Sequence, residues 1–433
     1  MSCTAPVPVP ADPASRVAAL RAKIPSEGLF AEKRWRLSPE AFPLSPLHLE
    51  KLEKLGPLLH RFNQACNLLY RQSVRGKQPA WIADLLDRGK PADLVEASRA
   101  DAAAQQVPAV IRPDLIVTEK GFCLCELDSV PGGIGLTAWM AQAYTELGEN
   151  VLGGPDGMRT GFASILPEGD VVISEEAATY RPEMEYLLGR DRVKAAETYQ
   201  PDGRPIYRFF ECFDWENTAL SNLRQNWSQM GPVTPPLKPY LEEKLWLALF
   251  WLRPLLPFWR RELSDKGVAL LQETIPYSWL VDPTPLPPHG VIPGLEIHDW
   301  KEMGQFSQAQ RELILKVSGY SPLAWGSRGV HLGSDLAAGA WQQEIDQALA
   351  SYGKTPYVLQ RFVKGALFDH PFVDEAGAVH VMKGRVRLCP YYFASKPETR
   401  PTVSGALATI CPADKKLIHG MKDAILVPAK AAA

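Results

Sequence analysis

The chain has 433 residues, 46% of them apolar and 22% charged, which is the composition of a globular protein with two or three packed units. Its formal net charge is −2 with both signs interspersed, and this excludes the strongly basic surface that suits a nucleic-acid partner. The N-terminus lacks the regions of a signal peptide, and the seven cysteines have no regular spacing, so we expect a cytoplasmic protein with reduced thiols.

Residues 1–100 are expected to form a helical segment after a Pro-rich start. Leucines recur at three- and four-residue steps and predict a mostly helical region over 46–86, which Gly56 and Pro57 are expected to kink or divide. This segment carries no recognisable motif, so the sequence predicts no function for it.

Residues 101–155 carry the next predicted unit. Short apolar runs at 115–117 and 122–125 flank a tight turn and predict a β-hairpin whose second strand leads into acidic residues. A glycine-rich turn follows at 131–135, and a helix is expected from about 136 to 147.

Residues 156–235 have the pattern of a separate α/β unit. Apolar strands are predicted at 170–174 and 206–210, with a helix between them that contains Tyr180 and Met184. A strand–helix–strand alternation of this kind favours a parallel sheet.

Residues 236–433 are expected to form the last part of the fold. A helical region over 241–263 is interrupted by prolines, so it is too broken to span a bilayer, and we expect no membrane contact. A Pro-rich connection comes next. The strands and helix predicted after it are listed in chain order: strand 313–317, a Gly/Ser loop to Gly333, a helix around Trp341, strand 357–360, and strands near 379–382 and 385–388.

Three carboxylates cluster around the predicted hairpin. Glu126 and Asp128 are two residues apart and would share one face of a strand, and the hairpin would bring Asp114 beside them. Oxygen ligands that converge at a strand end suit Mg2+, which completes its coordination shell with phosphates and water. The alternative, a solvated acidic strand edge, stays open from the sequence.

A lysine followed by a polar loop is the second candidate feature. Lys316 lies inside an apolar strand, where an unpaired ammonium group is costly, so a partner is expected. The loop that follows offers backbone N–H groups, hydroxyls and a guanidinium group for a phosphate, although it lacks the Walker A pattern. Its candidate residues are Ser318, Gly319, Gly326, Ser327, Arg328 and Gly329. The alternative is a surface loop beside an edge-strand lysine.

Two further patterns are weaker. The segment Gln360 to Val363 ends an apolar strand and is typical of a linker that contacts an adenine ring, although most such strands only form core. Arg385 and Arg387 would share a strand face, which suits phosphate or carboxylate binding, and an exposed strand face is the competing interpretation. The lone His419 is assigned no role.

Together these motifs resemble the ATP-grasp ligases in a circularly permuted order, the group that includes glutathionylspermidine synthase-like enzymes. The carboxylate hairpin with its Pro-Gly turn normally comes last in the chain, whereas here it precedes the Lys316 loop by almost two hundred residues. The resemblance covers about 111–428. It implies an ATP-grasp fold of the α+β or α/β class, with an inserted α/β unit and an N-terminal helical segment.

The resemblance also implies site roles. Asp114, Glu126 and Asp128 would hold Mg2+, although Asp128 replaces the usual Asn. Lys316 and Lys244 would contact ATP phosphates, with Lys238 an alternative to Lys244. The adenine linker would consist of Gln360, Arg361, Phe362 and Val363, where Gln360 replaces a frequent Glu. Arg387 would steady the transferred phosphate.

The implied activity is ATP-dependent ligation of a carboxylate to an amine through an acyl phosphate, with ADP and phosphate released. The carboxylate would lie near Arg112, Arg328 and Arg387, and the turn 131–135 would receive an anionic group. Expected partners are small molecules of the amino acid, peptide or polyamine class, and a homodimer is considered. Tyr180, Phe213 and Trp215 are candidates for a specificity pocket, and core packing explains them equally well. The alternatives are an ATP-dependent phosphotransferase and a non-catalytic ATP-binding sensor or partner protein.

Overall fold

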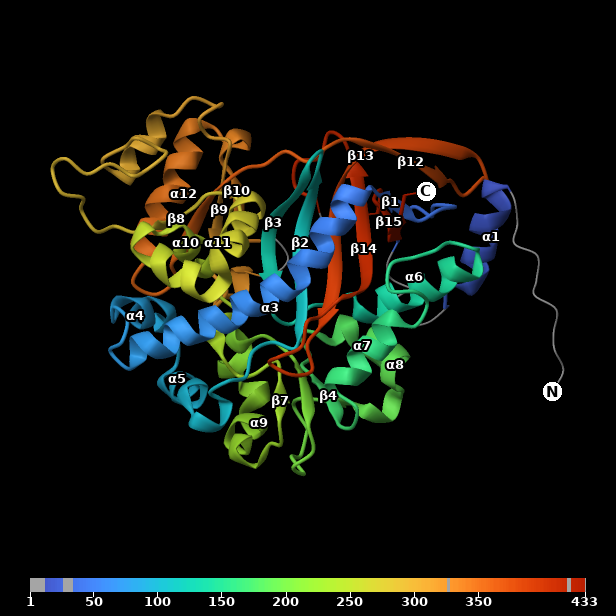
Figure 1. Cartoon of the computed structure of the whole chain (residues 1–433), viewed down its shortest axis with the longest axis horizontal. Helices are drawn as coiled ribbons and strands as arrows, with labels where there is room; N and C mark the ends of the chain where they lie inside the picture. Colours follow the sequence, from blue (N-terminus) through green and yellow to red (C-terminus); the bar gives the residue numbers. More distant parts are fainter. Residues whose placement is uncertain (1–11, 26–33, 325–327, 419–421, 433) are drawn as a thin grey trace.

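The chain is built around three β-sheets, as Figure 1 shows, within the described residues 12–25, 34–324, 328–418 and 422–432 of a computed structural model. A seven-stranded sheet lies in the centre, a four-stranded antiparallel sheet lies beside it, and a four-stranded parallel sheet lies at the opposite end of the molecule from α12. None of the helices in these ranges combines the length and the apolarity that a membrane crossing requires. The class is therefore mixed α/β, as expected.

The large sheet joins strands from both ends of the chain, in the order β1-β15-β14-β13-β2-β3, with β12 paired to β13. Its strands are β1 (Phe42–Leu44), β2 (Val110–Thr118), β3 (Gly121–Asp128), β12 (Phe368–Val373), β13 (Val379–Phe393), β14 (Val403–Pro412) and β15 (Ile425–Ala431). The predicted hairpin is present as the antiparallel pair β2–β3. The two short strands predicted after residue 378 are a single strand, β13, because the intervening Lys383 and Gly384 pair with β12 without a break.

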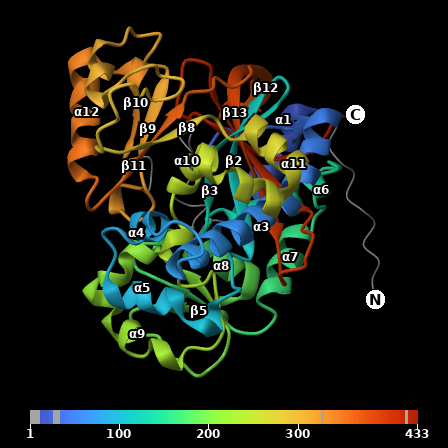
Figure 2. The same cartoon turned by 60° about the vertical axis from the view of Figure 1, so that its left-hand side comes forward.

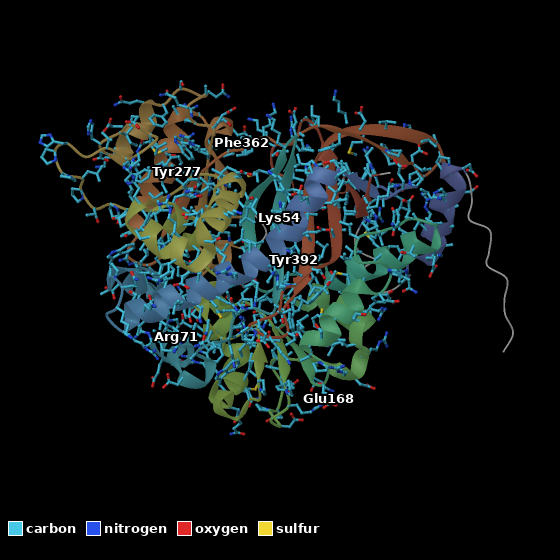
Figure 3. All side chains as sticks on the ribbon, viewed as in Figure 1. Lys54, Arg71, Glu168, Tyr277, Phe362 and Tyr392 are labelled. Atoms are coloured by element: carbon cyan, nitrogen blue, oxygen red, sulfur yellow. The ribbon has the colours of Figure 1, made fainter. Side chains whose placement is uncertain are left out.

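Helices of the N-terminal segment are α1 (Pro13–Lys23), α3 (Pro46–Val74), α4 (Trp81–Asp87) and α5 (Ala92–Arg99). Of these, α1 and α3 contact the large sheet, and α4 packs on α3. Neither Gly56 nor Pro57 divides α3, contrary to one of the two expected outcomes. Gly56 instead permits a close approach, because a Cβ atom there would lie 2.4 Å from the ring of Tyr392. The hydroxyl of Tyr392 donates to the carbonyl of Leu52 at 2.8 Å, which fixes α3 against β13 (Figure 3).

The middle α/β unit contains the parallel sheet β5-β4-β6-β7, and the predicted parallel arrangement is confirmed. Its strands are β4 (Asp170–Ile173), β5 (Val193–Ala195), β6 (Ile206–Phe209) and β7 (Val233–Thr234). The helices of this region are α6 (Ile134–Glu146), α7 (Gly157–Ile165), α8 (Arg181–Leu188) and α9 (Ser221–Gln225). Every residue of β4 and β6 is buried, so both faces of these strands are covered, which is the pattern of a sheet with packing on two sides.

The antiparallel sheet β10-β9-β11-β8 forms a lobe with its own core. Its elements are β8 (Ser278–Val281), β9 (Leu313–Val317), β10 (Val330–Leu332), α12 (Ala338–Ser351) and β11 (Tyr357–Arg361). Trp341 of α12 packs into the cluster that contains Leu315 and Leu359. Two helices, α10 (Leu245–Trp251) and α11 (Leu256–Thr274), precede this lobe, and their separation at Arg253 and Pro254 agrees with the predicted interruption.

Candidate active site

One cavity of about 1230 Å3 is lined by residues from all three sheets and their connections. The antiparallel lobe contributes Lys316 and Gln360, and the large sheet contributes Arg112 and Arg387. The middle unit contributes Tyr180 and residues that follow β6. The cavity therefore brings together most of the predicted site residues from distant parts of the chain.

The hairpin β2–β3 positions the predicted carboxylates. In its register Asp114 lies opposite Glu126, and Arg112 lies opposite Asp128. Arg112 Nη2 is 2.5 Å from Asp128 Oδ2 and 3.1 Å from Asp114 Oδ1. Arg387 of β13 donates to Asp114 Oδ2 at 3.3 Å from the other side. These side chains form one alternating array of charges on the cavity wall.

The carboxylates do not form the expected three-ligand cluster. Among the described residues, no group of three His, Cys, Asp or Glu side chains is placed to hold a metal ion. Arg112 lies between Asp114 and Asp128, and Lys244 pairs with Glu126 at 2.7 Å. The physical reason is that carboxylates at buried strand ends require nearby positive charge. Their role as metal ligands stays a prediction.

The charges at this wall are not evenly balanced. Burial acts to raise the pKa of Asp114, but Arg112 and Arg387 outweigh it and hold that pKa below its usual value. Burial raises the pKa of Asp128, and the charges of Glu126 and Asp114 add to the rise while Arg112 opposes it. A cation that approached Asp128 and Glu126 would relieve this repulsion. The donor set is therefore chemically suited to a hard cation such as Mg2+.

Lys316 faces the cavity from β9 with only 6% of its surface exposed. Its ammonium group donates to the carbonyl of Cys125 and to Gln360 Oε1, each at 2.8 Å. Both acceptors are neutral, and no carboxylate in the described ranges lies within ion-pair distance of this group. The positive charge of Lys316 is thus available to an anion in the cavity.

The structure separates the two lysines that the sequence left as alternatives. Lys244 lines the cavity, whereas Lys238 does not. Lys238 Nζ instead donates to Asn67 Oδ1 at 2.8 Å and to the carbonyl of Gln106 at 2.7 Å. It is buried against the N-terminal helices, so it is not placed to contact a ligand in this cavity.

Replacing Lys238 with methionine is expected to change the pH dependence of stability. Burial lowers the pKa of Lys238 to about 7. As the pH falls below 10.5, the unfolded chain binds a proton at Lys238, whereas the folded protein does not bind it until about pH 7. The free energy of unfolding of the wild type therefore decreases as the pH falls through this range. From pH 9 to pH 7 the wild type should lose up to about 1.4 kcal/mol per pH unit relative to the variant. Urea unfolding at both pH values measures the difference, and equal slopes would contradict a depressed pKa.

The loop after β9 is held by an unexpected carboxylate. Glu243 accepts hydrogen bonds from the hydroxyl of Ser318 and, at 3.0 Å, from the N–H of Gly319. A Cβ atom at Gly319 would lie 1.8 Å from the carbonyl oxygen of Glu242, so only glycine allows this approach. These two donors, predicted to contact phosphate, are therefore occupied by the protein's own carboxylate, and their contact with a phosphate stays a prediction. Of the two, Gly319 lines the cavity.

The other predicted loop residues have different positions. Gly326 and Ser327 lie outside the described residues. Arg328 lines the cavity, is exposed, and donates to the carbonyl of Pro322 at 2.9 Å. Gly329 is buried against Val317, and it does not line the cavity.

The predicted adenine linker lines the cavity throughout, from Gln360 to Val363. The side chain of Gln360 accepts from Lys316 and donates to Ser278 Oγ at 3.1 Å. These bonds hold Gln360 in position, so its side chain positions the lysine, which the sequence did not predict. Arg385 also lines the cavity, and its guanidinium group donates to the carbonyl of Ala413.

The turn before α6 was expected to receive an anion, but the protein supplies one itself. Glu183 Oε2 accepts from the N–H of Leu136 at 3.1 Å in the first turn of α6. The carbonyl of Gly132 accepts from the hydroxyl of Tyr391 at 2.6 Å. The N–H of Leu136 at this helix end is therefore taken by a buried side-chain carboxylate, as helix dipoles favour.

Acidic residues after β6 form a wall that the sequence analysis missed. Glu211 and Asp214 line the cavity beside Tyr180 and Phe213, whereas Trp215 is buried against Trp227 instead. Burial and then the charge of a neighbouring glutamate raise the pKa of Asp214 to about 7 and that of Glu211 well above its usual value. The only signal in the sequence was two acidic residues just after an apolar strand.

Comparison with known proteins shows the fold. No protein-family profile matches the chain, and no curated protein matches it. Among solved structures, it is similar to a glutathione synthetase-like effector (GSS30) of Globodera pallida in the apo form, with a TM-score of 0.52, 11% identity, and coverage of 98% of this chain and 99% of that chain. A protein of Methylobacillus flagellatus KT, provisionally named gamma-glutamylcysteine synthetase, matches with a TM-score of 0.37, 11% identity and coverage of 83% and 86%. The chain therefore has the fold of the glutathione synthetase-like effector over nearly its whole length.

Proposed function

We infer that the chain is a ligase that uses ATP and Mg2+ to join a carboxylate to an amine, with release of ADP and phosphate. The observation that carries this inference is the pairing of Lys316 with neutral groups in a cavity that Arg112, Arg387 and three carboxylates also line. A cationic wall suits the phosphates of a nucleotide, and carboxylates suit the cation that accompanies it. The fold shared with the glutathione synthetase-like effector agrees with a synthetase.

The proposed reaction has two steps. A substrate carboxylate oxygen attacks the γ-phosphorus, the bond to ADP breaks, and an acyl phosphate forms. The amine nitrogen then attacks the acyl carbon, phosphate leaves, and the nitrogen loses a proton. Lys316 and Lys244 hold phosphate oxygens, and Arg387 with Arg112 steadies the transferred group. Mg2+ bound with ATP supplies charge neutralisation, and Asp114, Glu126 and Asp128 are its proposed holders.

The two substrates are proposed to enter from different walls. The carboxylate lies beside Arg112 and Arg387, with the exposed Arg328 nearby, because these are the cationic groups closest to the transferred phosphate in this scheme. The amine lies on the side of Glu211 and Asp214, because the pKa of Asp214, raised to about 7, suits a group that exchanges a proton near neutral pH. The substrate class proposed is an amino acid, peptide or polyamine.

The proposal also covers the order of the motifs in the chain, the adenine contact, the cellular location and the partners. The carboxylate hairpin β2–β3 precedes the Lys316 loop in the chain yet pairs with β13, which is compatible with a circularly permuted ATP-grasp order. The adenine ring is proposed to contact the segment Gln360 to Val363. A cytoplasmic location, a possible homodimer and small-molecule partners, with neither nucleic acid nor membrane, complete the proposal.

The test is release of ADP and phosphate from Mg-ATP in the presence of pooled amino acids, short peptides and polyamines. Glu126→Ala is expected to lower the rate at least about 100-fold, because it removes a proposed metal ligand and leaves Lys244 without its carboxylate. Glu273→Ala, at an exposed surface ion pair, is the matched control and should keep the wild-type rate.

The outcomes separate the competing functions. Turnover that requires both an acid and an amine supports the ligase. Turnover with an added hydroxyl compound alone identifies a phosphotransferase. ATP binding without turnover in any pool identifies a sensor or partner protein, and absence of ATP binding contradicts the nucleotide site.

A further inference from the structure

The turn between α4 and α5 docks on the antiparallel lobe through three consecutive residues. Arg88 lies over the ring of Tyr352 at 4.3 Å, and its guanidinium group donates to the carbonyl of the same residue. Gly89 has a φ of +71°, and a Cβ atom there would lie 2.1 Å from the carbonyl oxygen of Lys354. Figure 2 shows α4 directly beneath this lobe. The third residue of the turn, Lys90, therefore lies between the N-terminal helices and the antiparallel lobe.

Lys90 forms an ion pair with Glu243, the residue that holds the loop after β9. The Lys90 ammonium is 2.5 Å from Glu243 Oε1, and the two side chains are 1% and 2% exposed. The other oxygen of Glu243 accepts from Ser318 and Gly319. One carboxylate therefore connects the N-terminal helices to the first two residues of the loop.

The two halves of this connection depend on each other. A carboxylate buried this deeply is costly unless a cation neutralises it, and removing one partner of a buried ion pair leaves the other uncompensated. Without Lys90, the uncompensated carboxylate of Glu243 would be driven to turn toward water. This movement would weaken the hydrogen bonds that Glu243 accepts from the N–H of Gly319 and the hydroxyl of Ser318.

The segment that contains Glu243 also reaches the proposed nucleotide site. Lys244, next in the chain, lines the cavity, pairs with Glu126 and donates to the carbonyl of Ala324 at 3.4 Å. The position of Glu243 therefore sets the position of a lysine in the cavity as well as the start of the loop. Lys90 itself is not among the residues that line the cavity.

We propose that Lys90 is a positioning residue of the nucleotide site, which acts through Glu243 to fix the loop that follows β9. This assigns the N-terminal helical segment a part in nucleotide binding, and it rests on the proposed function for the identity of the ligand. The proposed contact between the helices and the loop is a property of the free protein, so it can be tested without a nucleotide.

The chain offers a matched control in the neighbouring ion pair. Arg208 and Glu242 are also buried, with side chains 0% and 6% exposed, and lie 2.5 Å apart. Glu242 also accepts from the N–H of Cys212, so this pair joins the same segment to the middle α/β unit and not to the N-terminal helices. Loss of either pair should destabilise the fold to a similar extent, but only loss of Lys90 should release Glu243.

The experiment compares Lys90→Met, Lys90→Arg and Arg208→Met in the full chain by two readouts. The first is hydrogen exchange of peptides that cover 318–324 without any nucleotide, and the second is the Kd of Mg-ADP by calorimetry. Lys90→Met is expected to speed loop exchange at least tenfold and to raise the Kd at least tenfold. Lys90→Arg should restore both values to within about threefold, because it retains the charge.

The control decides between positioning and general destabilisation. Arg208→Met should lower the melting temperature by a similar amount while it leaves loop exchange and the Kd within twofold of wild type. Equal effects of Arg208→Met and Lys90→Met would overturn the proposal, as would a Lys90→Met loop that exchanges like wild type. If the wild type binds no Mg-ADP, the proposed function fails, and the exchange data still decide whether Lys90 positions the loop.

Discussion

Replacing Lys316 with methionine is expected to lower kcat/KM for ATP by about 100- to 1000-fold. The ammonium group of Lys316 bonds only to the carbonyl of Cys125 and the side chain of Gln360, so its charge is not neutralised locally by the described residues. Loss of one preorganised cation that stabilises transferring phosphate typically costs this much in rate. Steady-state ADP release over a range of ATP concentrations measures the effect.

Several controls keep this prediction specific. Methionine matches the length of the lysine stem, so β9 should remain packed, and thermal unfolding checks that it does. Lys301→Met changes an exposed lysine of the same lobe and should retain the wild-type value. An unchanged kcat/KM in a folded Lys316→Met variant would remove the central residue of the proposed nucleotide site.

Gln360→Leu provides a finer test of the same group. It removes one of the two acceptors that position Lys316, while Leu preserves the volume of a residue that is 1% exposed. The expected loss in kcat/KM for ATP is about tenfold, smaller than that of Lys316→Met because the charge remains. A loss as large as that of Lys316→Met would indicate that Gln360 contacts the substrate itself.

Local patterns in the sequence were sufficient for much of the fold. The apolar run 313–317 is β9 with the predicted bounds, and the strand–helix–strand alternation of the middle unit is a parallel sheet. Such elements are predictable because side-chain periodicity and turn residues act over a few neighbours. The hairpin β2–β3 was predictable for the same reason, and its register places Asp114 opposite Glu126, as the predicted carboxylate cluster requires.

Charge partners were not predictable in the same way. Lys90 and Glu243 are far apart in the chain, and neither belongs to a motif. Which cation neutralises which carboxylate depends on packing of distant elements, and a sequence pattern carries no information on it. The bonds of Ser318 and Gly319 to Glu243 follow from that packing, which is why a loop with phosphate-binding character has two of its donors occupied.

The prediction of a metal site was limited in the same way, because it could not include charge partners from distant parts of the chain. Residue type and spacing correctly placed the three carboxylates on one cavity wall, but not Arg112 between two of them. This arrangement has a testable energetic consequence, because Arg112 is the one partner shared by Asp114 and Asp128 in the described part of the chain.

Arg112→Leu is expected to lower the free energy of unfolding by about 3–5 kcal/mol at pH 7.5, because it leaves the buried Asp114 and the half-buried Asp128 with too little compensation. Without Arg112 the folded pKa values of Asp114 and Asp128 rise relative to those of the wild type, because Arg112 lowers both. Carboxyl groups with a raised folded pKa favour the folded state at low pH, and this stability is lost as the pH rises through the folded pKa. The loss in free energy of unfolding caused by Arg112→Leu should therefore be smallest near pH 4.5. Urea unfolding at pH 4.5, 6 and 7.5 measures it.

Arg311→Leu is the matched control, because this buried arginine bonds to the carbonyls of Gly333, Phe306 and Leu336 and, within the described ranges, to no carboxylate. The loss in free energy of unfolding caused by Arg311→Leu should therefore not vary with pH. Millimolar Mg2+ should restore part of the stability that Arg112→Leu loses, since a divalent cation can replace the guanidinium group between the carboxylates. The same Mg2+ concentration should stabilise this variant more than it stabilises the wild type. A pH-dependent deficit that Mg2+ leaves unchanged would confirm the ion pairs and count against these carboxylates as the metal ligands.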